Sequence, residues 1–498
     1  MVEARSLKTM EAPRQKLMKE RATVVATTTL AVCAAPIARG GPSVAMSLCS
    51  HMSAAGATLC ILQGMTALNI VERLREAGHL AYWVGGCVRD LLLGRDPKDY
   101  DIATSARPEE VLALYPDAMR VGAHFGVVLV EGVEVATFRS DQAYSDGRRP
   151  DAVVFEKSPE ADAARRDFTI NGMFLDPVSG DVLDFVGGRA DLAAGIVRAI
   201  GDPLQRFAED HLRLLRAVRF AARFGFVLDE ETCRAMVAQA ASIRLVAAER
   251  VRDELTRILT EGGASAGFAI LRDTGLLVQV LPEIAAMEGV EQPPEFHPEG
   301  DVWTHTLLML AGLRAPSVTL AWGVLLHDVG KPPTFRRAER IRFDGHASVG
   351  ARMSREMLGR LRFSADEIDQ VVNLVTHHLD WMHVQSMRPS TLRRFLRLPL
   401  FQEHQELHRL DCESSHRRLK NYEFVRAQLA TLSEADLRPV PLLTGHDLIA
   451  AGLVPGPTFS AILTEIENAQ LDGRVQTREE ALRLALDVFR QRDCDSAT

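Results

Sequence analysis

The stretch Gly85-Gly86-Cys87-Val88-Arg89-Asp90 decides how the first part of this chain folds. A short apolar run, 81–84, precedes the glycines and predicts a buried strand, and residues 88–93 predict the next helix. Backbone N–H groups that glycines expose at a strand-to-helix junction can hold phosphate oxygens, with help from the helix N-terminus. Arg89 can add a charge-assisted contact. The stretch therefore predicts a phosphate cradle.

Two carboxylates follow in Asp99-Tyr100-Asp101, where residues 99–103 predict a second strand. Residues i and i+2 of a strand point to the same face. Two carboxylates on one face repel each other unless a cation lies between them. Mg²⁺ is the simplest such cation, because it usually takes one or two carboxylates together with substrate phosphates. A phosphate cradle beside this pair predicts nucleotidyl transfer.

A third acid, Glu134, interrupts the apolar run 133–138. This run and residues 127–130 predict a hairpin, with Glu131-Gly132 near the turn. Val133 and Val135 would share the face opposite to Glu134. Glu134 is therefore either an outward-facing strand residue or the third carboxylate that two-metal phosphoryl chemistry uses, and the nearby acids favour the second interpretation.

The composition is that of a globular protein in a reducing compartment. The chain has 498 residues, of which 47% are hydrophobic and 25% are charged, which is enough for about three or four domains. Its net charge of -8 excludes a uniformly basic coat, although a local basic stripe suffices for nucleic acid. The seven cysteines lack paired spacing, which favours a cytoplasmic location. The sequence contains no uninterrupted apolar run of about 20 residues, so no membrane-spanning helix is predicted.

The pattern of the chain changes near residue 201. A helix over 67–77 and several short strands make residues 65–200 an α/β unit. Beyond it, residues 207–224 predict one long helix whose arginines at 213, 216, 219 and 223 share a face, and helical pattern continues to the C-terminus. The predicted fold class is α+β, with a small α/β head of mixed sheet followed by an elongated all-α remainder.

Residues 1–64 stand apart from this pattern. Residues 1–21 are basic and residues 22–38 are small and apolar, which in part resembles a signal peptide. A disordered extension or a misassigned start is the favoured interpretation, with Met65 as the alternative start.

Two further motifs complete a family resemblance, namely Arg165-Arg166-Asp167-Phe168-Thr169-Ile170-Asn171 and Glu209-Asp210-His211-Leu212-Arg213. Together with the two segments above, they resemble, in order and spacing, the signatures of the class II tRNA nucleotidyltransferase and bacterial poly(A) polymerase family. The resemblance runs from about residue 65 to the end, and 443–481 are similar to the family's tail. It implies a nucleotidyltransferase head (the palm) over 65–200, a helical neck with a base-reading motif over 201–265, an HD-type domain over 266–430 and a tRNA-binding tail over 431–498.

The resemblance implies a role for each motif residue in adding CCA to tRNA 3′ ends from CTP and ATP. Asp99 and Asp101 would hold Mg²⁺ on the triphosphate, and Glu134 would help to activate the primer's 3′-hydroxyl. Asp210 would accept a hydrogen bond from the exocyclic amine that cytosine and adenine share, while Arg213 would donate to the base. The other implied contacts are to phosphate, ribose or RNA and come from Gly85, Gly86, Arg89, Arg165, Arg166, Asp167, Asn171, Arg216 and Arg219.

The polar loop 140–150 bears on which nucleotides are added. The family uses a flexible loop here when it switches from C to A addition, so its presence argues against an enzyme that adds only C. It does not separate a CCA-adding enzyme from one that adds only A.

A second constellation resembles the HD-domain metal phosphohydrolases. Its members are histidines and carboxylates spread over several predicted helices: His305, His327, Asp328, His346, His377 and Asp411. Such ligands suit a divalent metal whose identity the sequence leaves open. Of the adjacent pair His377-His378, His377 is favoured. The resemblance implies a phosphodiesterase or phosphatase acting on 2′,3′-cyclic or 3′-phosphate RNA ends, although the same helices could simply hold tRNA.

Two alternatives remain at this point. A poly(A) polymerase or an A-adding enzyme would use the same head, but strongly basic extensions would favour it, and residues after Pro439 carry few clustered basic side chains. An HD phosphohydrolase with an inactive head is disfavoured, because Asp99, Asp101 and Glu134 are all present.

Overall fold

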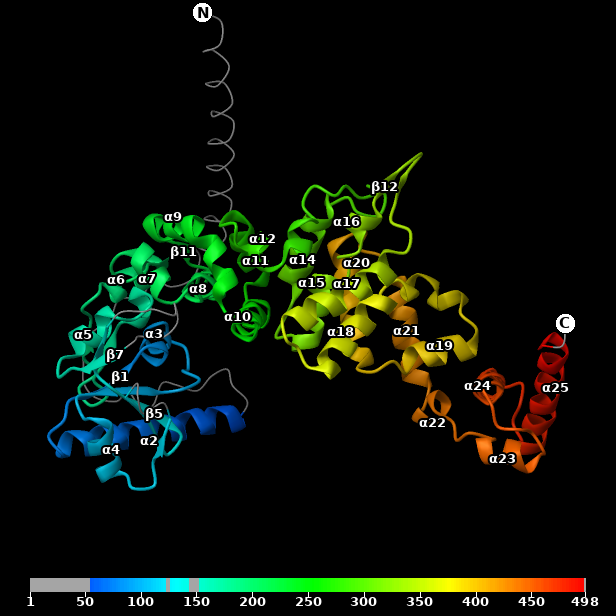
Figure 1. Cartoon of the computed structure of the whole chain (residues 1–498), viewed down its shortest axis with the longest axis horizontal. Coiled ribbons are helices and arrows are strands. Elements are labelled where there is room, and N and C mark those ends of the chain that lie inside the picture. Colours follow the sequence, from blue (N-terminus) through cyan, green and yellow to red (C-terminus); the bar gives the residue numbers. More distant parts are fainter. Residues whose placement is uncertain (1–53, 122–125, 143–151, 497–498) are drawn as a thin grey trace, which may run out of the picture. The chain divides into compact units, whose positions relative to one another are not determined.

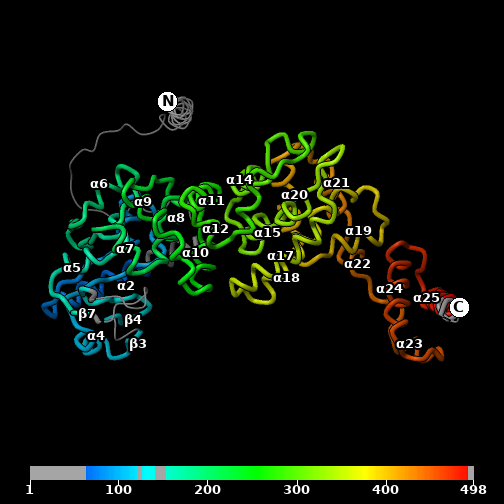
Figure 2. The backbone as a smooth tube through the Cα atoms, turned by 45° about the horizontal axis from the view of Figure 1, so that its top comes forward, coloured from blue at the N-terminus to red at the C-terminus, as the bar shows by residue number. Residues whose placement is uncertain are grey.

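The computed structural model describes residues 54–121, 126–142 and 152–496 (Figure 1). Most of the predicted loop 140–150 lies outside these residues. The chain forms a sheet-containing head, followed by a series of helices that begins at α7 (Pro203–Glu209) (Figure 2). No helix within the described ranges is long and apolar enough to cross a membrane.

The head is built on a seven-stranded mixed sheet, which confirms the predicted fold class. Its neighbouring strands are antiparallel except for β2 and β5, which run parallel. In sheet order, the strands are β3 (Met119–Arg120), β4 (Val127–Val130), β5 (Val133–Thr137), β2 (Asp101–Thr104), β1 (Ala81–Val84), β8 (Phe174–Leu175) and β9 (Val182–Leu183). A separate antiparallel pair is formed by β6 (Arg139–Gln142) and β7 (Ala152–Phe155).

Helix α2 (Ala54–Glu76) contributes to the core beneath this sheet. Ala67, Ile70, Val71 and Leu74 are buried at helical spacing and join the cluster that contains Ile102 of β2. The helix begins well before Met65, so the helical pattern extends into the region that the sequence assigned to an extension. The other head helices are α3 (Gly86–Leu92), α4 (Pro108–Leu114), α5 (Pro159–Ala164), η3 (Thr169–Asn171) and α6 (Gly188–Ala194).

The predicted hairpin is confirmed in β4 and β5, which pair antiparallel. Glu131 and Gly132 both have positive φ, at 49° and 84°, as the favoured two-residue hairpin turn requires. Val133 and Val135 are buried and Glu134 is exposed on the opposite face. The alternation of the sequence therefore placed this acid correctly on the open side of its strand.

The long helix predicted over 207–224 is wrong, because the structure divides it into α7 and α8 (Arg213–Phe224). Asp210 ends α7 with an extended backbone, and its Oδ1 accepts a hydrogen bond from the Leu212 backbone N–H at 3.1 Å. Aspartate side chains that bond the backbone two residues on compete with the helix in this way. The break places residues 209–213 at a corner between α7 and α8.

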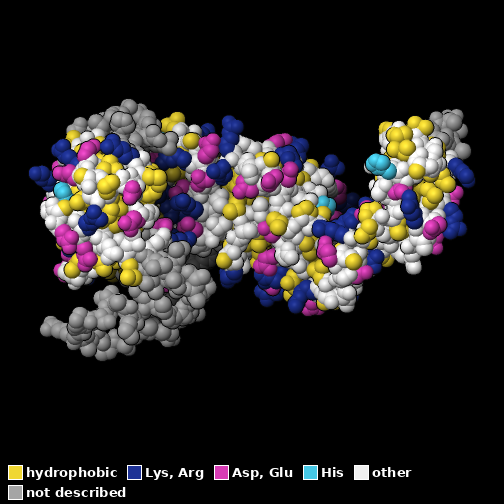
Figure 3. Space-filling view, turned by 90° about the horizontal axis from the view of Figure 1, so that it is seen from below, with side chains coloured by type: hydrophobic (Ala, Val, Ile, Leu, Met, Phe, Trp, Pro, Cys, Tyr) yellow, Lys and Arg dark blue, Asp and Glu magenta, His cyan; other side chains and the backbone are white. Residues whose placement is uncertain are grey.

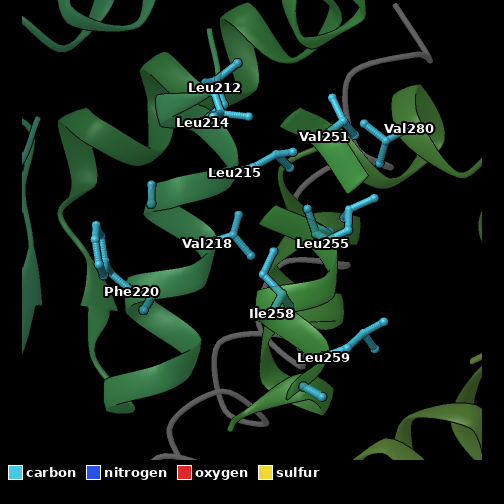
Figure 4. Packing of buried hydrophobic residues seen from close by; sticks show 14 of the residues in the cluster. Leu212, Leu214, Leu215, Val218, Phe220, Val251, Leu255, Ile258, Leu259 and Val280 are labelled. Carbon is cyan, nitrogen blue, oxygen red and sulfur yellow. The ribbon is translucent and has the colours of Figure 1, made fainter. Parts of the chain in front are cut away.

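Helix α8 packs against α10 (Ala248–Thr260) through a buried apolar seam (Figure 4). Leu215 and Val218 face Leu255 and Ile258, and each of the four is at most 1% exposed. The remaining neck elements are β10 (Ile196–Val197), which pairs with β11 (Val227–Leu228), α9 (Glu230–Gln239), η4 (Ala240–Leu245), α11 (Ala264–Asp273), α12 (Leu276–Val280) and α13 (Pro282–Ala285).

Helices also make up the remainder of the described chain, apart from one short hairpin. The region after the neck contains α14 (Val302–Gly312), α15 (Val318–Leu326), α16 (Lys331–Thr334), β12 (Arg336–Arg337), β13 (Ile341–Arg342), α17 (His346–Arg360), α18 (Ala365–His377), η5 (Asp380–Ser386), α19 (Pro389–Leu396), α20 (Phe401–Ser414) and α21 (Lys420–Thr431). The last elements are α22 (Glu434–Leu437), α23 (Gly445–Ala450), α24 (Thr458–Leu471) and α25 (Arg478–Ser496). Residues from 443 onward have an apolar cluster of their own, which includes Leu448, Ile462 and Ala485.

Candidate active site and a second ligand cluster

A cleft of about 690 Å³ brings together residues from all four head and neck motifs. Basic side chains outnumber acidic ones in its lining, and Figure 3 shows Lys and Arg gathered in a recess at the level of α8 and α10. The charged and glycine residues that line it are Gly85, Gly86, Arg89, Asp90, Lys98, Asp99, Asp101, Arg165, Arg166, Asp167, Asp210, Arg213, Arg216, Arg219, Arg223, Arg250, Arg257 and Glu261.

The carboxylates of Asp99 and Asp101 both line the cleft, but only Asp101 lies in the strand that was predicted to contain both. Asp101 begins β2, whereas Asp99 lies in the loop before the strand, so the two carboxylates are not an i, i+2 pair within a strand. Burial, the charge of Glu134 and the charge of Asp99 raise the pKa of Asp101 to about 6, although Arg166 opposes them. A carboxyl whose ionisation is opposed by burial and by neighbouring acids suits a cation.

Glu134 lies next to Asp101, because the parallel register of β2 and β5 pairs these two residues. The carboxylates of Asp99, Asp101 and Glu134 do not converge within 4.8 Å as a three-ligand group in this structure. Two carboxylates together with substrate phosphates are the ligands that Mg²⁺ usually takes, and Asp99 and Asp101, both in the cleft lining, fit that requirement.

Gly85 and Arg89 shape the floor of the cleft. Gly85 has φ of 77°, and a Cβ there would lie 3.3 Å from Nη1 of Arg166, so this position favours glycine. Arg89 is only 4% exposed and donates to Asp90 Oδ1 at 2.8 Å and to Asn171 Oδ1 at 2.5 Å. Its guanidinium also lies over the rings of Phe220 and Phe224. Arg89 therefore ties α3 to η3 and α8, and most of its donors are already engaged.

Arg165 and Arg166 share a partner that the sequence analysis missed. Both donate to the fully buried carboxylate of Asp162, with closest distances of 2.6 and 2.9 Å. Burial alone would raise the pKa of Asp162, but the charges of Arg166 and Arg165 outweigh it and hold this pKa below its usual range. The spacings of three and four residues on a helix were the available signal.

Asp167 connects the head to the neck. Its Oδ2 accepts from Arg216 Nη2 at 2.6 Å, and its Oδ1 accepts from Asn171 Nδ2 at 3.0 Å. Asn171 ends the short 3₁₀ turn η3, and Asp167 lies just before that turn. Burial opposes ionisation of Asp167, and the charge of Arg216 overcomes it and keeps the pKa well below its usual range.

The predicted base-reading pair lines the cleft, and each member is held by a different neighbour. Asp210 accepts two hydrogen bonds from Arg250, at 3.2 and 2.8 Å. Arg213 Nη1 donates to Glu209 Oε2 at 2.6 Å and to the Arg206 carbonyl at 2.9 Å. Asp210 and Arg213 therefore present fixed polar groups to the cleft.

Helix α10 and the residue after it supply side chains at or near the cleft that the sequence analysis did not identify. Arg250, Glu254, Arg257 and Glu261 recur every three or four residues, which was the signal for a shared face. Glu254 accepts from Arg219 at 2.6 Å, and Glu261 accepts from Arg223 at 3.1 Å. Because Arg219 is 5% exposed, it contributes more to this α8–α10 contact than to an open surface.

The second constellation forms a buried ligand cluster in the helices that follow the neck. Nε2 of His305 lies 3.2 Å from Asp411 Oδ1, and Nε2 of His327 lies 3.1 Å from Asp328 Oδ2. Asp328 Oδ1 lies 3.6 Å from Nε2 of His346. The first two contacts are close but lack hydrogen-bond geometry, so Nε2 of His305 and Nε2 of His327 have no hydrogen-bond partner among the described residues. The ligand atoms form two neighbouring groups, His305 with His327 and Asp411, and Asp328 with His346 and His378, and within each group they lie within 4.8 Å of one another. Imidazole and carboxylate donors of this kind fit a transition metal.

His378 occupies the place that the sequence analysis assigned to His377. Nε2 of His378 lies 3.2 Å from Nε2 of His346 and 3.9 Å from Asp328 Oδ1. His377 instead points to Asp380, with Nδ1 2.7 Å from Oδ2, and its side chain is 30% exposed. Consecutive helical residues point about 100° apart, so only one of them can face the cluster.

Comparison with known proteins places this chain in a family. The Poly A polymerase head domain model matches residues 81–198, the model for the probable RNA and SrmB-binding site of polymerase A matches 225–288, and the HD domain model matches 301–412. The resemblance predicted from the four motifs is thereby confirmed.

Individual relatives agree with these matches. A CCA-adding enzyme of Geobacillus sp. (strain WCH70) is 44% identical over 216 residues, which are 43% of this chain and only 53% of that protein. The Bacillus stearothermophilus CCA-adding enzyme in complex with CTP superimposes with a TM-score of 0.67 at 29% identity, covering 86% of this chain and 98% of that one. A CCA-adding enzyme of Leuconostoc mesenteroides is 32% identical over 423 residues, which are 84% of this chain and 94% of that protein. The chain therefore belongs to the CCA-adding enzyme family.

Proposed function

We propose that this protein adds C and A nucleotides to tRNA 3′ ends from CTP and ATP, without a nucleic-acid template, by metal-dependent nucleotidyl transfer. The observation that carries the proposal is the single cleft that holds Asp99 and Asp101 together with Asp210 and Arg213. It combines groups for the triphosphate with groups for the base. Membership of the CCA-adding enzyme family supports tRNA 3′ ends as the substrate and C and A as the added nucleotides.

Asp99 and Asp101 would hold the metal, which would neutralise charge on the triphosphate and lower the pKa of the primer's 3′-hydroxyl. Glu134 would accept the proton of that hydroxyl, and its register with Asp101 supports this role. The basic lining of the cleft offsets the charge of the nucleotide. The positive φ of Gly85 lets the backbone turn at the edge of this space.

Base selection would rest on Asp210 and Arg213. The Asp210 carboxylate would accept from the exocyclic amine of cytosine or adenine, and Arg213 would donate to ring nitrogen or carbonyl groups. Uracil and guanine lack the amine at that position. Arg250 and Glu209 support this proposal, because they fix the orientation of both side chains. Residues 431–498 would contribute to holding tRNA.

Extension of tRNA that lacks its last three nucleotides tests this function. We expect one or two C residues with CTP alone, the complete CCA with CTP and ATP, and no A addition to this substrate with ATP alone. A tRNA that already ends in CC is the matched control and should accept one A. Long adenosine tails would instead support poly(A) polymerase activity, and failure to extend either tRNA would overturn the proposal.

We also propose that the HD region hydrolyses phosphate esters at RNA ends. The supporting observation is the orientation of three cluster histidines, whose Nδ1 atoms contact the backbone carbonyls of Val324, Phe343 and Val375 at 2.7 to 2.9 Å. This contact leaves Nε2 as the free ligand atom, as metal-bound histidines require. His305, His327, Asp328, His346, His378 and Asp411 would hold the ion, which would supply a bound hydroxide.

Hydrolysis of an RNA with a 2′,3′-cyclic phosphate end tests this second activity. His327→Ala with Asp328→Ala should abolish metal-dependent hydrolysis and leave nucleotide addition unchanged. Absence of hydrolysis in the wild-type protein would overturn the proposed activity, and loss of both activities in the variant would indicate damage to the fold.

A further inference from the structure

His305 is held differently from the other three histidines of the HD cluster. His327, His346 and His378 each place Nδ1 against the carbonyl of the residue three positions earlier. His305 instead places Nδ1 2.7 Å from the carboxylate oxygen Oε1 of Glu299. One ligand of the cluster is therefore backed by a negative charge rather than by a backbone dipole.

The Glu299 side chain is largely buried, and its carboxylate contacts two histidines. Its Oε1 also lies 2.9 Å from Nδ1 of His297, whose ring packs edge-on against the ring of His305 with centroids 4.9 Å apart. The Glu299 side chain is only 7% exposed, and its Oε2 has no hydrogen-bond partner among the described residues. A buried carboxylate opposes folding unless it is paired and hydrogen-bonded, and Glu299 obtains its pairing from His297 and His305 alone among the described residues.

The segment that carries His297 and Glu299 is anchored where it enters α14. Asp301 caps this helix by accepting from the Thr304 backbone N–H at 2.8 Å, and its other oxygen accepts from the Gly289 backbone N–H at 2.6 Å. The Val302 backbone N–H donates to the Val290 carbonyl at 3.0 Å. These contacts close the loop on itself and fix the approach of Glu299 to His305.

The contact has a consequence for the ligand atom. A carboxylate accepts hydrogen bonds, so Glu299 requires the proton of a neutral His305 to be on Nδ1. The lone pair is then on Nε2, which faces Asp411 and His327. The negative charge also makes the imidazole a stronger electron donor, as carboxylate–histidine–metal arrangements do.

We infer that Glu299 is a positioning residue that orients His305 and strengthens it as a metal ligand of the HD centre, and that His297 holds Glu299 in place. The inference rests on the proposed metal centre. The alternative is that His297, Glu299 and His305 themselves bind a second ion, since their ligand atoms lie within 4.8 Å of one another. In that arrangement His305 would bridge two ions, which the Nδ1 contact to Glu299 disfavours.

Metal affinity tests the inference without relying on catalysis. The full chain with Asp99→Ala and Asp101→Ala is titrated with Co²⁺ against a competing chelator, so that the absorption of bound Co²⁺ reports the HD centre. Glu299→Gln in this background should weaken Co²⁺ binding about 10- to 100-fold and shift the absorption spectrum. His297→Ala should weaken it less. Glu295→Gln, an exposed acid in the same loop, is the matched control and should bind like the parent.

The possible results distinguish failure of the proposed metal centre from failure of the role assigned to Glu299. No Co²⁺ binding at the HD centre of the parent would overturn the metal centre itself. Equal affinity and spectra for the parent and Glu299→Gln would overturn the positioning role alone. Loss of one of two bound ions in Glu299→Gln would identify a second metal site in its place. In the otherwise wild-type chain, Glu299→Gln should retain nucleotide addition, which shows that it folds.

Discussion

Asp101 and Glu134 lie side by side on parallel strands, and burial together with the charge of Glu134 raises the pKa of Asp101 to about 6. An acid whose charge is disfavoured in this way in the free protein is suited to binding a cation. The arrangement depends on the parallel register of β2 with β5, which neither strand determines by itself.

Replacing Asp101 should abolish nucleotide addition. Asp101→Asn keeps the shape of the side chain and removes a metal-binding charge. We therefore expect the rate of CTP incorporation to fall more than about 100-fold, which is more than the loss caused by removing a residue that only orients a metal ligand. Asp96→Asn, an exposed aspartate in the preceding loop, should have no effect. Retention of more than a tenth of the rate by Asp101→Asn, with the fold intact by circular dichroism, would remove this residue from the mechanism.

Glu134→Gln should separate chemistry from binding. The strand is unchanged and the side chain is exposed, so the KM for CTP should stay within about twofold. The single-turnover rate should fall by about 10² to 10⁴, the usual contribution of a general base. A raised KM with an unchanged rate would instead assign Glu134 to nucleotide binding.

Much of the head could be predicted from sequence, because its signals are local. The strand 81–84, the glycine turn and the hairpin around Glu131-Gly132 follow from apolar runs and turn chemistry. The break at Asp210 was missed because apolar periodicity continues through it, while a side-chain contact to Leu212 ends the helix. The predicted strand wrongly included Asp99, because the sequence alone does not show where strand pairing begins. In the structure, pairing of β2 begins only at Asp101.

The rest of the site depends on contacts between distant elements. Arg250 reaches Asp210 from α10, forty residues away along the chain, and no local pattern pairs these two residues. The choice between His377 and His378 depends on how α18 is rotated against its neighbours. Glu299 lies in a loop with no motif, and only the fold brings it to His305.

Asp210→Asn should weaken the choice of base more than the rate of addition. The amide presents donors where the carboxylate only accepts, so the preference for CTP over UTP, measured as the ratio of kcat/KM, should fall about 10- to 100-fold, in line with about 1 to 3 kcal/mol for a base contact. Arg250→Gln should change the ratio in the same direction by less. The exposed Arg234→Gln of α9 is the control. An unchanged ratio in Asp210→Asn would contradict the base-reading role.

Asp162→Asn should lower stability in a pH-dependent way. The folded pKa of Asp162 is depressed, so its stabilisation is present above the unfolded pKa of about 3.9 and is lost as pH falls through the folded pKa. We expect a lower melting temperature at pH 7 and a difference from wild type that shrinks below about pH 4. A difference that is constant across this range would show that the charge of Asp162 is not responsible.

Gly85→Ala should impair nucleotide binding in addition to stability. The added Cβ is strained at a φ of 77° and approaches Arg166 at the cleft, with a cost of about 1 to 3 kcal/mol. Gly94→Ala is a matched control, since Gly94 has a φ of 67° with nothing within 4 Å of its Cβ position. Both variants should lose stability, and only Gly85→Ala should raise the KM for CTP. Equal KM values for the two variants would remove Gly85 from the nucleotide site.

If this cleft builds CCA on tRNA, the sequence of the extended 3′ end will show it. Purified protein is incubated with Mg²⁺, an equimolar mixture of all four nucleoside triphosphates and tRNA that lacks its last three nucleotides. We expect the 3′ ends to become CCA and extension then to stop. Ends made of A alone, ends that contain U or G at a comparable frequency, or long untemplated tails would contradict it.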